Sequence, residues 1–393
     1  MKKEEMDLLF QETFDHNDYR LFFAPGRINL IGEHTDYNGG HVFPCAITYG
    51  TYALVSKRKD NAIRLYSENF PEEGLIEFDL TNLQYDTKHS WANYAKGMIN
   101  YLKQAGYKIE NGLDILIHGN IPNGAGLSSS ASIELVIGIA LEKLFNLDIE
   151  RIEFVKIGQQ VENNFIGVNS GIMDQFAIGM GKKDFGMLLN CQTLACEYAP
   201  IQLHQHHIVI MNTNKRRTLA DSKYNERKSE CEEALEVLKK VTNINSLGEL
   251  TEGTFENVKN YLPNEIIQRR VQHVVSENSR TLKALRALKA NDLHEFGQLM
   301  DASHCSLRDD YEVTGKELDT LVETAWNQKG VIGARMTGAG FGGCAIAIVE
   351  KEQVEQFIDK VGAIYKEKIG YEATFYVASI GDGARELTEE EDK

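Results

Sequence analysis

Three glycine-rich segments constrain this chain more than any other feature. They are GRINLIGEHTDYNGG at Gly26–Gly40, PNGAGLSSSAS at Pro122–Ser132 and TGAGFGG at Thr337–Gly343. Glycine has no Cβ atom, so it lets a backbone approach phosphate or sugar oxygens closely. The fold therefore has to bring bare backbone against a ligand, and the pattern favours an enzyme that handles phosphate groups.

Length and charge narrow the class of protein. A chain of 393 residues is too long for one ordinary core, so we expect two domains, residues 1–200 and residues 201–393. Its contents of hydrophobic (42%) and charged (25%) residues are those of a soluble globular protein. The formal net charge of −16 argues against nucleic-acid binding through a broad basic face.

Targeting signals are not expected. No run of 18 apolar residues occurs and the N-terminus lacks an apolar core, so we predict neither a membrane span nor a signal peptide. The six cysteines form no CxxC pair, so we expect free thiols in a reducing cytoplasm.

Periodicity predicts a mixture of strands and helices that does not alternate in regular βαβ units, so the predicted class is α+β. The predicted strands are 21–24, 41–47, 51–57, 63–67, 113–118, 185–191, 207–213, 344–349 and 372–378. The predicted helices are 91–107, one that begins in the serine run at 128–130 and has its apolar positions at 133–144, 151–164, 219–240, 279–290, 292–304, 315–328 and 351–367.

The second glycine-rich segment opens one of these helices. Free backbone N–H groups and the helix dipole therefore meet at Gly124–Ser130, which indicates an anion site. No GxxxxGK[ST] motif occurs, so this is not a P-loop. A serine hydroxyl beside bound phosphate can ligate magnesium, and Ser130 is our candidate. The alternative is an ordinary helix cap, in which the hydroxyls of Ser128, Ser129 and Ser130 cap the helix.

The third glycine-rich segment formally satisfies GxGxxG through Gly338, Gly340 and Gly343. A dinucleotide-binding fold would place a helix directly after it, but CAIAIVE reads as a strand, so we reject that interpretation. A tight hairpin turn is the simple alternative, although it needs fewer glycines.

The first glycine-rich segment gathers polar side chains between two predicted strands: Arg27, Glu33, His34, Asp36 and Tyr37. Such a loop suits a polyhydroxylated ligand, because one carboxylate can accept hydrogen bonds from two adjacent hydroxyls. One histidine with an aspartate two residues later is weak evidence for a metal.

Other polar residues carry simple alternatives. Asp174 follows the turn-rich GVNSG, and its simple alternative is a helix cap; for Glu162 the simple alternative is a surface carboxylate. The histidine tract at His204, His206 and His207 resembles a metal-binding tract, but we expect it to be solvated.

Together, the three segments resemble those of the galactokinase family in the GHMP small-molecule kinase superfamily. GRINLIGEHTDYNGG is similar to the galactokinase signature, IPNGAGLSSSA to the superfamily's phosphate loop and MTGAGFGG to its third motif, in the same order from about Leu21 to Ala378. The resemblance implies a two-domain fold with the active site in the interdomain cleft. It also implies ATP-dependent phosphorylation of the C1 hydroxyl of galactose, the first phosphorylation step of galactose catabolism.

The resemblance implies roles for individual residues. Asp174 would be the general base, and Arg27 would keep it ionised and stabilise the transferring phosphoryl group. Ser130 and Glu162 would bind Mg²⁺, with ATP as co-substrate. Apart from the resemblance, we expect a cytoplasmic protein that acts as a monomer. The implied sugar contacts are Glu33, His34, Thr35, Asp36, Gly171 and Tyr224. The implied ATP contacts are Ser67, Trp91, Pro122, Asn123, Gly124, Ala125, Gly126, Leu127, Ser128, Ser129 and Ser130.

Two other functions are weighed against this one. A sister kinase acting on N-acetylgalactosamine stays open, whereas GEHTDYNGG argues against mevalonate and homoserine kinases. A sensor that binds sugar and ATP without turnover is disfavoured because LSSSAS is intact and Asp174 is present.

Overall fold

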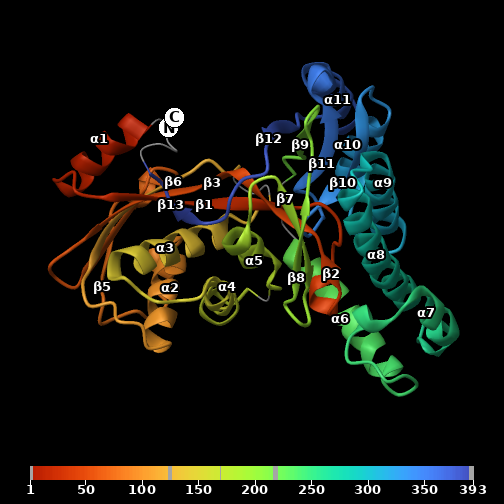
Figure 1. The fold of residues 1–393 in the computed structure, drawn as a ribbon, viewed down its shortest axis with the longest axis horizontal. Helices are drawn as coiled ribbons and strands as arrows, with labels where there is room; N and C mark the ends of the chain where they lie inside the picture. The colour runs from red at the N-terminus through yellow and green to blue at the C-terminus, as the bar shows by residue number, and fades with distance from the viewer. Residues whose placement is uncertain (1–2, 123–125, 169, 216–219, 389–393) are drawn as a thin grey trace.

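The computed structural model describes residues 3–122, 126–168, 170–215 and 220–388. Figure 1 shows two sheet-based halves, one red to yellow and one green to blue, with a small sheet between them. Helices pack on both larger sheets, which confirms the predicted α+β class. In the part of the chain that is described, no helix is long and apolar enough to cross a bilayer.

The N-terminal half is built on a six-stranded sheet in the order β13-β1-β3-β6-β4-β5, in which only the β4–β6 pair is parallel. Its strands are β1 (Arg20–Asn29), β3 (Pro44–Lys57), β4 (Ala62–Ser67), β5 (Ile76–Asp79), β6 (Leu113–Gly119) and β13 (Arg385–Glu386). The accompanying helices are α1 (Lys3–Phe14), α2 (Ala92–Gln104), α3 (Ser129–Phe145), α4 (Arg151–Gln160) and α5 (Met173–Met180).

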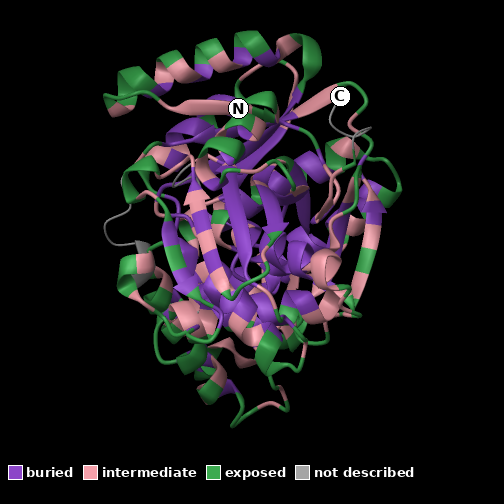
Figure 2. Ribbon diagram, turned by 90° about the vertical axis from the view of Figure 1, so that its left-hand side faces the viewer, coloured by how far each residue is buried: buried purple, intermediate pink, exposed green. Residues whose placement is uncertain are grey.

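Alternating side chains decide which helix covers which face of this sheet. Ala53 and Ile115 pack into the cluster with α2 and α3, whereas Leu54 and Leu116 pack against α1. The period of two follows from strand geometry, since successive side chains point to opposite faces. Both faces are therefore buried, as Figure 2 shows for the interior strands.

The C-terminal half is built on a four-stranded antiparallel sheet in the order β10-β11-β9-β12. Its strands are β9 (His206–Asn212), β10 (Val331–Thr337), β11 (Cys344–Glu350) and β12 (Thr374–Ala378). Its helices are α6 (Ala220–Leu238), α7 (Glu252–Val258), α8 (Glu265–Lys289), α9 (Leu293–Asp309), α10 (Lys316–Trp326) and α11 (Val354–Ile369).

A three-stranded sheet of β2 (His41–Val42), β7 (Phe185–Asn190) and β8 (Cys196–Pro200) lies where the halves meet. Helix α8 packs on all three of its strands, and β13 returns from the C-terminus to pair with β1. The predicted domain boundary after residue 200 falls between β8 and β9, and it stays a prediction.

Elements such as α1, α7, β5 and β8 were not predicted, and three further differences from the predicted elements have a clear physical cause. Residues 44–57 form one strand, because Gly50 lets β3 run close to β1: a Cβ atom there would lie 2.3 Å from the carbonyl oxygen of Ala24. Strand β10 was missed because Gly333 interrupts its apolar pattern, and this glycine packs against α9. Helix α8 begins at Glu265, well before the predicted residue 279, because the buried polar residues Arg270, His273 and Glu277 break its apolar pattern.

Candidate active site

One cavity of about 530 Å³ lies where the three glycine-rich segments converge, a volume that suits a small-molecule site. Arg27 comes from β1, Gly126–Ser130 from the loop before α3 and the first turn of that helix, and Gly338 from the loop between β10 and β11. The other lining residues are Glu33, His34, Asp36, Glu162, Gly167, Val168, Ser170, Gly171, Met173, Asp174, Tyr224, Asn225 and Ala339. Segments far apart in the sequence thus form one site.

Asp174, in the first turn of α5, is held on both carboxylate oxygens. Its Oδ1 accepts from Arg27 Nε at 2.9 Å and lies 2.8 Å from Arg27 Nη2, while its Oδ2 accepts from Ser128 Oγ at 2.5 Å. Arg27 is 5% exposed and also donates from Nη1 to the Gly126 carbonyl at 2.7 Å. The pair therefore fixes the carboxylate beside the second glycine-rich segment. Asp174 is not the helix cap that its sequence context allowed.

A second carboxylate, Glu162, lies on the other side of the same loop. It accepts from Ser130 Oγ at 2.8 Å, from Ser170 Oγ at 3.2 Å and from Gln175 Nε2 at 2.6 Å. Burial and the nearby charge of Asp174 raise the pKa of Glu162. Glu162 is buried, so the interpretation of it as a surface carboxylate is wrong.

Gln175 continues this contact inward to Glu134, a fully buried carboxyl group on α3. The same Gln175 Nε2 donates to Glu134 Oε2 at 3.1 Å. Burial, with the nearby charge of Glu162, raises the pKa of Glu134 well above its usual range, which favours the neutral acid at pH 7.

The first glycine-rich segment forms the opposite wall. Burial raises the pKa of Asp36 to about 6, with further contributions from Asp174 and Glu33. Gly171 is needed beside it, because a Cβ atom at this position would lie 2.1 Å from Asp36 Oδ2. A small backbone thus lets this carboxyl group reach the cavity.

His34 presents an unused ring nitrogen to the same wall. Its Nδ1 lies 2.9 Å from the Tyr37 hydroxyl, whereas the buried Nε2 has no hydrogen-bond partner among the described residues. Burial lowers the pKa of His34 to about 3, so the ring is neutral at pH 7. A buried polar atom without a partner in a cavity wall is available to a polar ligand.

Of the remaining predicted sugar contacts, Tyr224 and Glu33 line the cavity and Thr35 does not. Tyr224 of α6 lines the cavity. Glu33 also lines it, but its Oε1 accepts from the Gly338 backbone N–H at 2.8 Å. Thr35 is fully buried outside the cavity lining, and its hydroxyl donates to the carbonyl groups of Gly32 and His41. The structure therefore gives Thr35 a role in holding the loop.

The predicted ATP contacts fall into three groups. Gly126–Ser130 line the cavity, whereas Asn123, Gly124 and Ala125 lie outside the described residues. Pro122, Ser67 and Trp91 do not line it, and their contact with a nucleotide stays a prediction. Trp91 is buried, and its indole N–H has no partner among the described residues.

The expected capping of α3 by serine hydroxyls is wrong for Ser128 and Ser130. Ser128 is the N-cap of α3 with φ at +65°, and no side chain there accepts from the helix N–H groups. Its hydroxyl, like that of Ser130, instead donates to a cavity carboxylate. The third segment joins antiparallel β10 and β11, so the hairpin interpretation is correct, and Gly338 and Ala339 line the cavity as well.

Sequence reasoning missed several residues of the site and its support: Ser170, Gln175, Glu134 and Asn225. Only Ser170 carried a signal, since it lies in the turn-rich segment before Asp174. The described residues contain no cluster of three or more His, Cys, Asp or Glu that would hold a metal, and the tract His204–His207 is exposed or half-buried.

Family models match three stretches of the chain. Residues 8–57 match the galactokinase galactose-binding signature. Residues 93–182 match the N-terminal domain of GHMP kinases, and residues 284–367 match the C-terminal domain. The first and second matches contain the first and second glycine-rich segments, respectively, and the third contains the last.

Curated relatives and solved structures agree with these matches. A galactokinase of Exiguobacterium sibiricum is 62% identical over 99% of this chain and all of the relative. The galactokinase of Lactococcus lactis, solved in complex with galactose, is 53% identical and superposes with a TM-score of 0.95 over 98% of this chain and 99% of its own. The Methanococcus jannaschii mevalonate kinase, at 19% identity and a TM-score of 0.65 over 93% of this chain and 100% of its own, shares the fold.

Proposed function

The chain belongs to the galactokinase family, and from that premise we propose how its cavity phosphorylates galactose. As a GHMP kinase it is an ATP-dependent sugar kinase that transfers the γ-phosphoryl group of ATP to the C1 hydroxyl of galactose. The products are galactose 1-phosphate and ADP. The roles of individual residues below are our proposal.

One observation carries the proposal: Asp174 lies in the cavity with its carboxylate held by Arg27 and Ser128, between the sugar loop and the phosphate loop. We use sugar loop for Gly32–Asp36 and phosphate loop for Gly126–Ser130. Phosphoryl transfer depends mainly on positioning the nucleophile and neutralising charge. A carboxylate fixed where both substrates meet can take the hydroxyl proton as the new bond forms.

The sugar loop supplies the hydrogen-bonding groups for galactose. The ionised Asp36 carboxylate accepts from adjacent hydroxyl groups, and His34 Nε2, which has no partner among the described residues, provides one more polar contact. Tyr224 closes the same wall from the C-terminal half. A site built to bind hydroxyls rejects sugars that lack them, because its buried polar groups would be left unpaired.

The phosphate loop receives ATP. Backbone N–H groups at the N-terminus of α3 and the positive end of its dipole favour the phosphates. Arg27 is fixed beside the loop through the Gly126 carbonyl, where its charge stabilises the transferring group.

A magnesium ion fits the donor set beside this loop. Ser130 and Glu162 offer hard oxygen ligands, and the described residues place no lysine or arginine in an ion pair with Glu162. Mg²⁺ is usually held by one or two carboxylates together with substrate phosphates, which agrees with so small a protein ligand set. When bound, the ion would neutralise phosphate charge.

The six cysteines are free, which supports a reducing cytoplasm, and we propose that the enzyme is monomeric.

The deciding experiment measures Mg²⁺-dependent ADP release with galactose, glucose, N-acetylgalactosamine and mevalonate, for the wild type and Asp174→Asn. We expect turnover on galactose, and a loss in the variant of about 10²–10⁴-fold in kcat, the usual contribution of a general base. The variant should still bind galactose and ATP, as calorimetry would show. Turnover of the variant at the wild-type rate would contradict the proposed base, and turnover mainly on N-acetylgalactosamine would change the substrate.

A further inference from the structure

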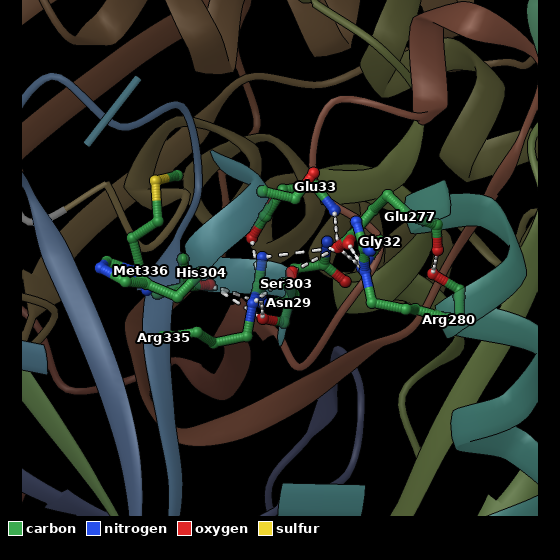
Figure 3. Close-up of polar contacts among 12 residues, drawn as sticks. Asn29, Gly32, Glu33, Glu277, Arg280, Ser303, His304, Arg335 and Met336 are labelled. Atoms are coloured by element: carbon green, nitrogen blue, oxygen red, sulfur yellow. Dashed lines mark hydrogen bonds and ion pairs between the residues drawn. The ribbon is translucent and has the colours of Figure 1, made fainter. Parts of the chain in front are cut away.

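Beneath the sugar loop, outside the cavity lining, a fully buried carboxylate holds the backbone of that loop. Oε1 of Glu277, on α8, accepts from the backbone N–H groups of Gly32 at 2.8 Å and Glu33 at 3.2 Å, and from Ser303 Oγ at 2.6 Å (Figure 3). Successive N–H groups that converge on one oxygen form a concave anion-binding site. Gly32 makes this shape possible with φ at +93°, in the left-handed region.

The charge of Glu277 is balanced by two arginines. Arg280 donates from Nε to Glu277 Oε2 at 2.8 Å, and Nη2 of Arg335 lies 3.8 Å from Oε1. Although burial alone would raise it, these cations lower the pKa of Glu277 to about 2. The carboxylate is therefore ionised at any physiological pH.

Arg335 extends the contact to the side chains that face the cavity. Fully buried on β10, it donates from Nη1 to the Asn29 carbonyl at 3.0 Å and to Glu33 Oε1 at 3.4 Å. The same Glu33 oxygen accepts from the Gly338 backbone N–H at 2.8 Å. Glu277 and Arg335 thus connect α8 and β10 with the first and third glycine-rich segments.

We propose that Glu277 is a positioning residue for the sugar pocket. By fixing the backbone at Gly32 and Glu33 it sets where His34 and Asp36 point, although its own side chain does not line the cavity. The inference rests on the proposed role of the sugar loop. Displacing binding groups by about 1 Å can lower activity a hundredfold, so the buried carboxylate has a kinetic consequence.

The test compares Glu277→Gln with Asp114→Asn. Asp114 is also a buried carboxylate between two arginines, Arg58 at 3.0 Å and Arg64 at 2.6 Å, but it lies on β6 away from the cavity. We expect Glu277→Gln to raise the KM for galactose about tenfold or more, while the KM for ATP changes less than about twofold. Asp114→Asn should lower stability without changing the KM for galactose.

Two further variants keep the outcome decisive. If Glu277→Gln does not fold, Ser303→Ala is the second variant. It removes one of the three hydrogen bonds to Oε1, together with the one that Ser303 Oγ accepts from Arg335 Nε at 3.2 Å, and keeps both Glu277 and Arg335 in place. It should raise the galactose KM severalfold. Asp36→Asn tests the sugar loop itself. If Asp36→Asn weakens galactose binding but Glu277→Gln and Ser303→Ala match Asp114→Asn, the inference is wrong and the proposed site stands. If none of Asp36→Asn, Glu277→Gln and Ser303→Ala weakens galactose binding, the positioning role of Glu277 and the proposed sugar site are both wrong. Equal increases in both KM values would also overturn the positioning role.

Discussion

Two buried carboxylates on either side of the cavity, Glu277 beneath the sugar loop and Glu162 beside the phosphate loop, are stabilised in opposite ways. On the sugar side, Glu277 is paired with Arg280 and Arg335, which lower its pKa to about 2 although burial would raise it. On the phosphate side, Glu162 has hydroxyl and amide donors, and burial raises its pKa. Glu277 therefore has its counter-charges within the fold, whereas Glu162 has no cationic partner among the described residues and is the carboxylate that we propose a bound cation completes.

Among the variants that test this comparison, the largest expected effect comes from removing the carboxylate of Glu162. Glu162→Gln should raise the Mg²⁺ concentration for half-maximal ADP release about a hundredfold, because the ion loses a charged ligand. Manganese binding, followed by electron paramagnetic resonance with ATP present, gives a readout that does not depend on turnover.

Glu134→Gln is the matched control for this prediction. Glu134 is a buried carboxyl group that contacts the same Gln175, and burial raises its pKa well above its usual range. Replacing a neutral acid by an amide should leave the Mg²⁺ dependence unchanged. If the two variants shift it equally, the assignment of Glu162 to magnesium fails.

The next effect concerns stability beneath the sugar loop. The folded pKa of Glu277, about 2, lies below its unfolded value of about 4.3, so its contribution is present above the unfolded pKa and is lost as pH falls through the folded pKa. Urea unfolding should show wild type more stable than Glu277→Gln by about 3 kcal/mol at pH 7 and at pH 5.5. The gap should narrow at pH 4, and a gap that widens there would contradict the ionised, paired carboxylate.

Asp36 predicts a pH dependence of the KM for galactose. Its pKa is raised by burial, whereas the pKa of Glu277 is lowered by the neighbouring arginines. Burial raises the pKa of Asp36 to about 6, and the proposed contact with galactose needs the ionised form. The KM for galactose should therefore rise as pH falls below 6, approaching about tenfold per pH unit. Asp36→Asn should remove this dependence and leave the KM for ATP unchanged over the same range. An unchanged pH profile in the variant would exclude Asp36 as its source.

The smallest effect concerns Ser128, which joins the two walls through Asp174. Ser128→Ala removes the 2.5 Å hydrogen bond to Oδ2, and should lower kcat by about three- to tenfold, the value of one such bond. Ser129→Ala is the control, because Ser129 lines the cavity but is exposed at its surface. Equal losses in both variants would argue for a general effect on the loop.

The site was predictable where residue type and local spacing carry the chemistry. Arg27, His34 and Asp36 share one segment, and the resemblance placed Asp174 with them, as the cavity does. Capping by the serines was wrong because Ser128 adopts a left-handed backbone and its hydroxyl turns to Asp174. Local sequence predicts that a hydroxyl needs a partner, but not which partner the tertiary fold brings nearest.

By itself, the sequence determined the α+β class, the three glycine-rich segments and the chemical character of each one, because these depend on residue type and short-range period. Only the tertiary structure decided that Glu277 and Arg335, distant in sequence and without a recognisable motif, meet under the sugar loop. It also decided that Glu134 is buried and linked to Glu162 through Gln175. The physical reason is that burial and opposing charge set the state of a carboxyl group, and both come from residues that other segments supply.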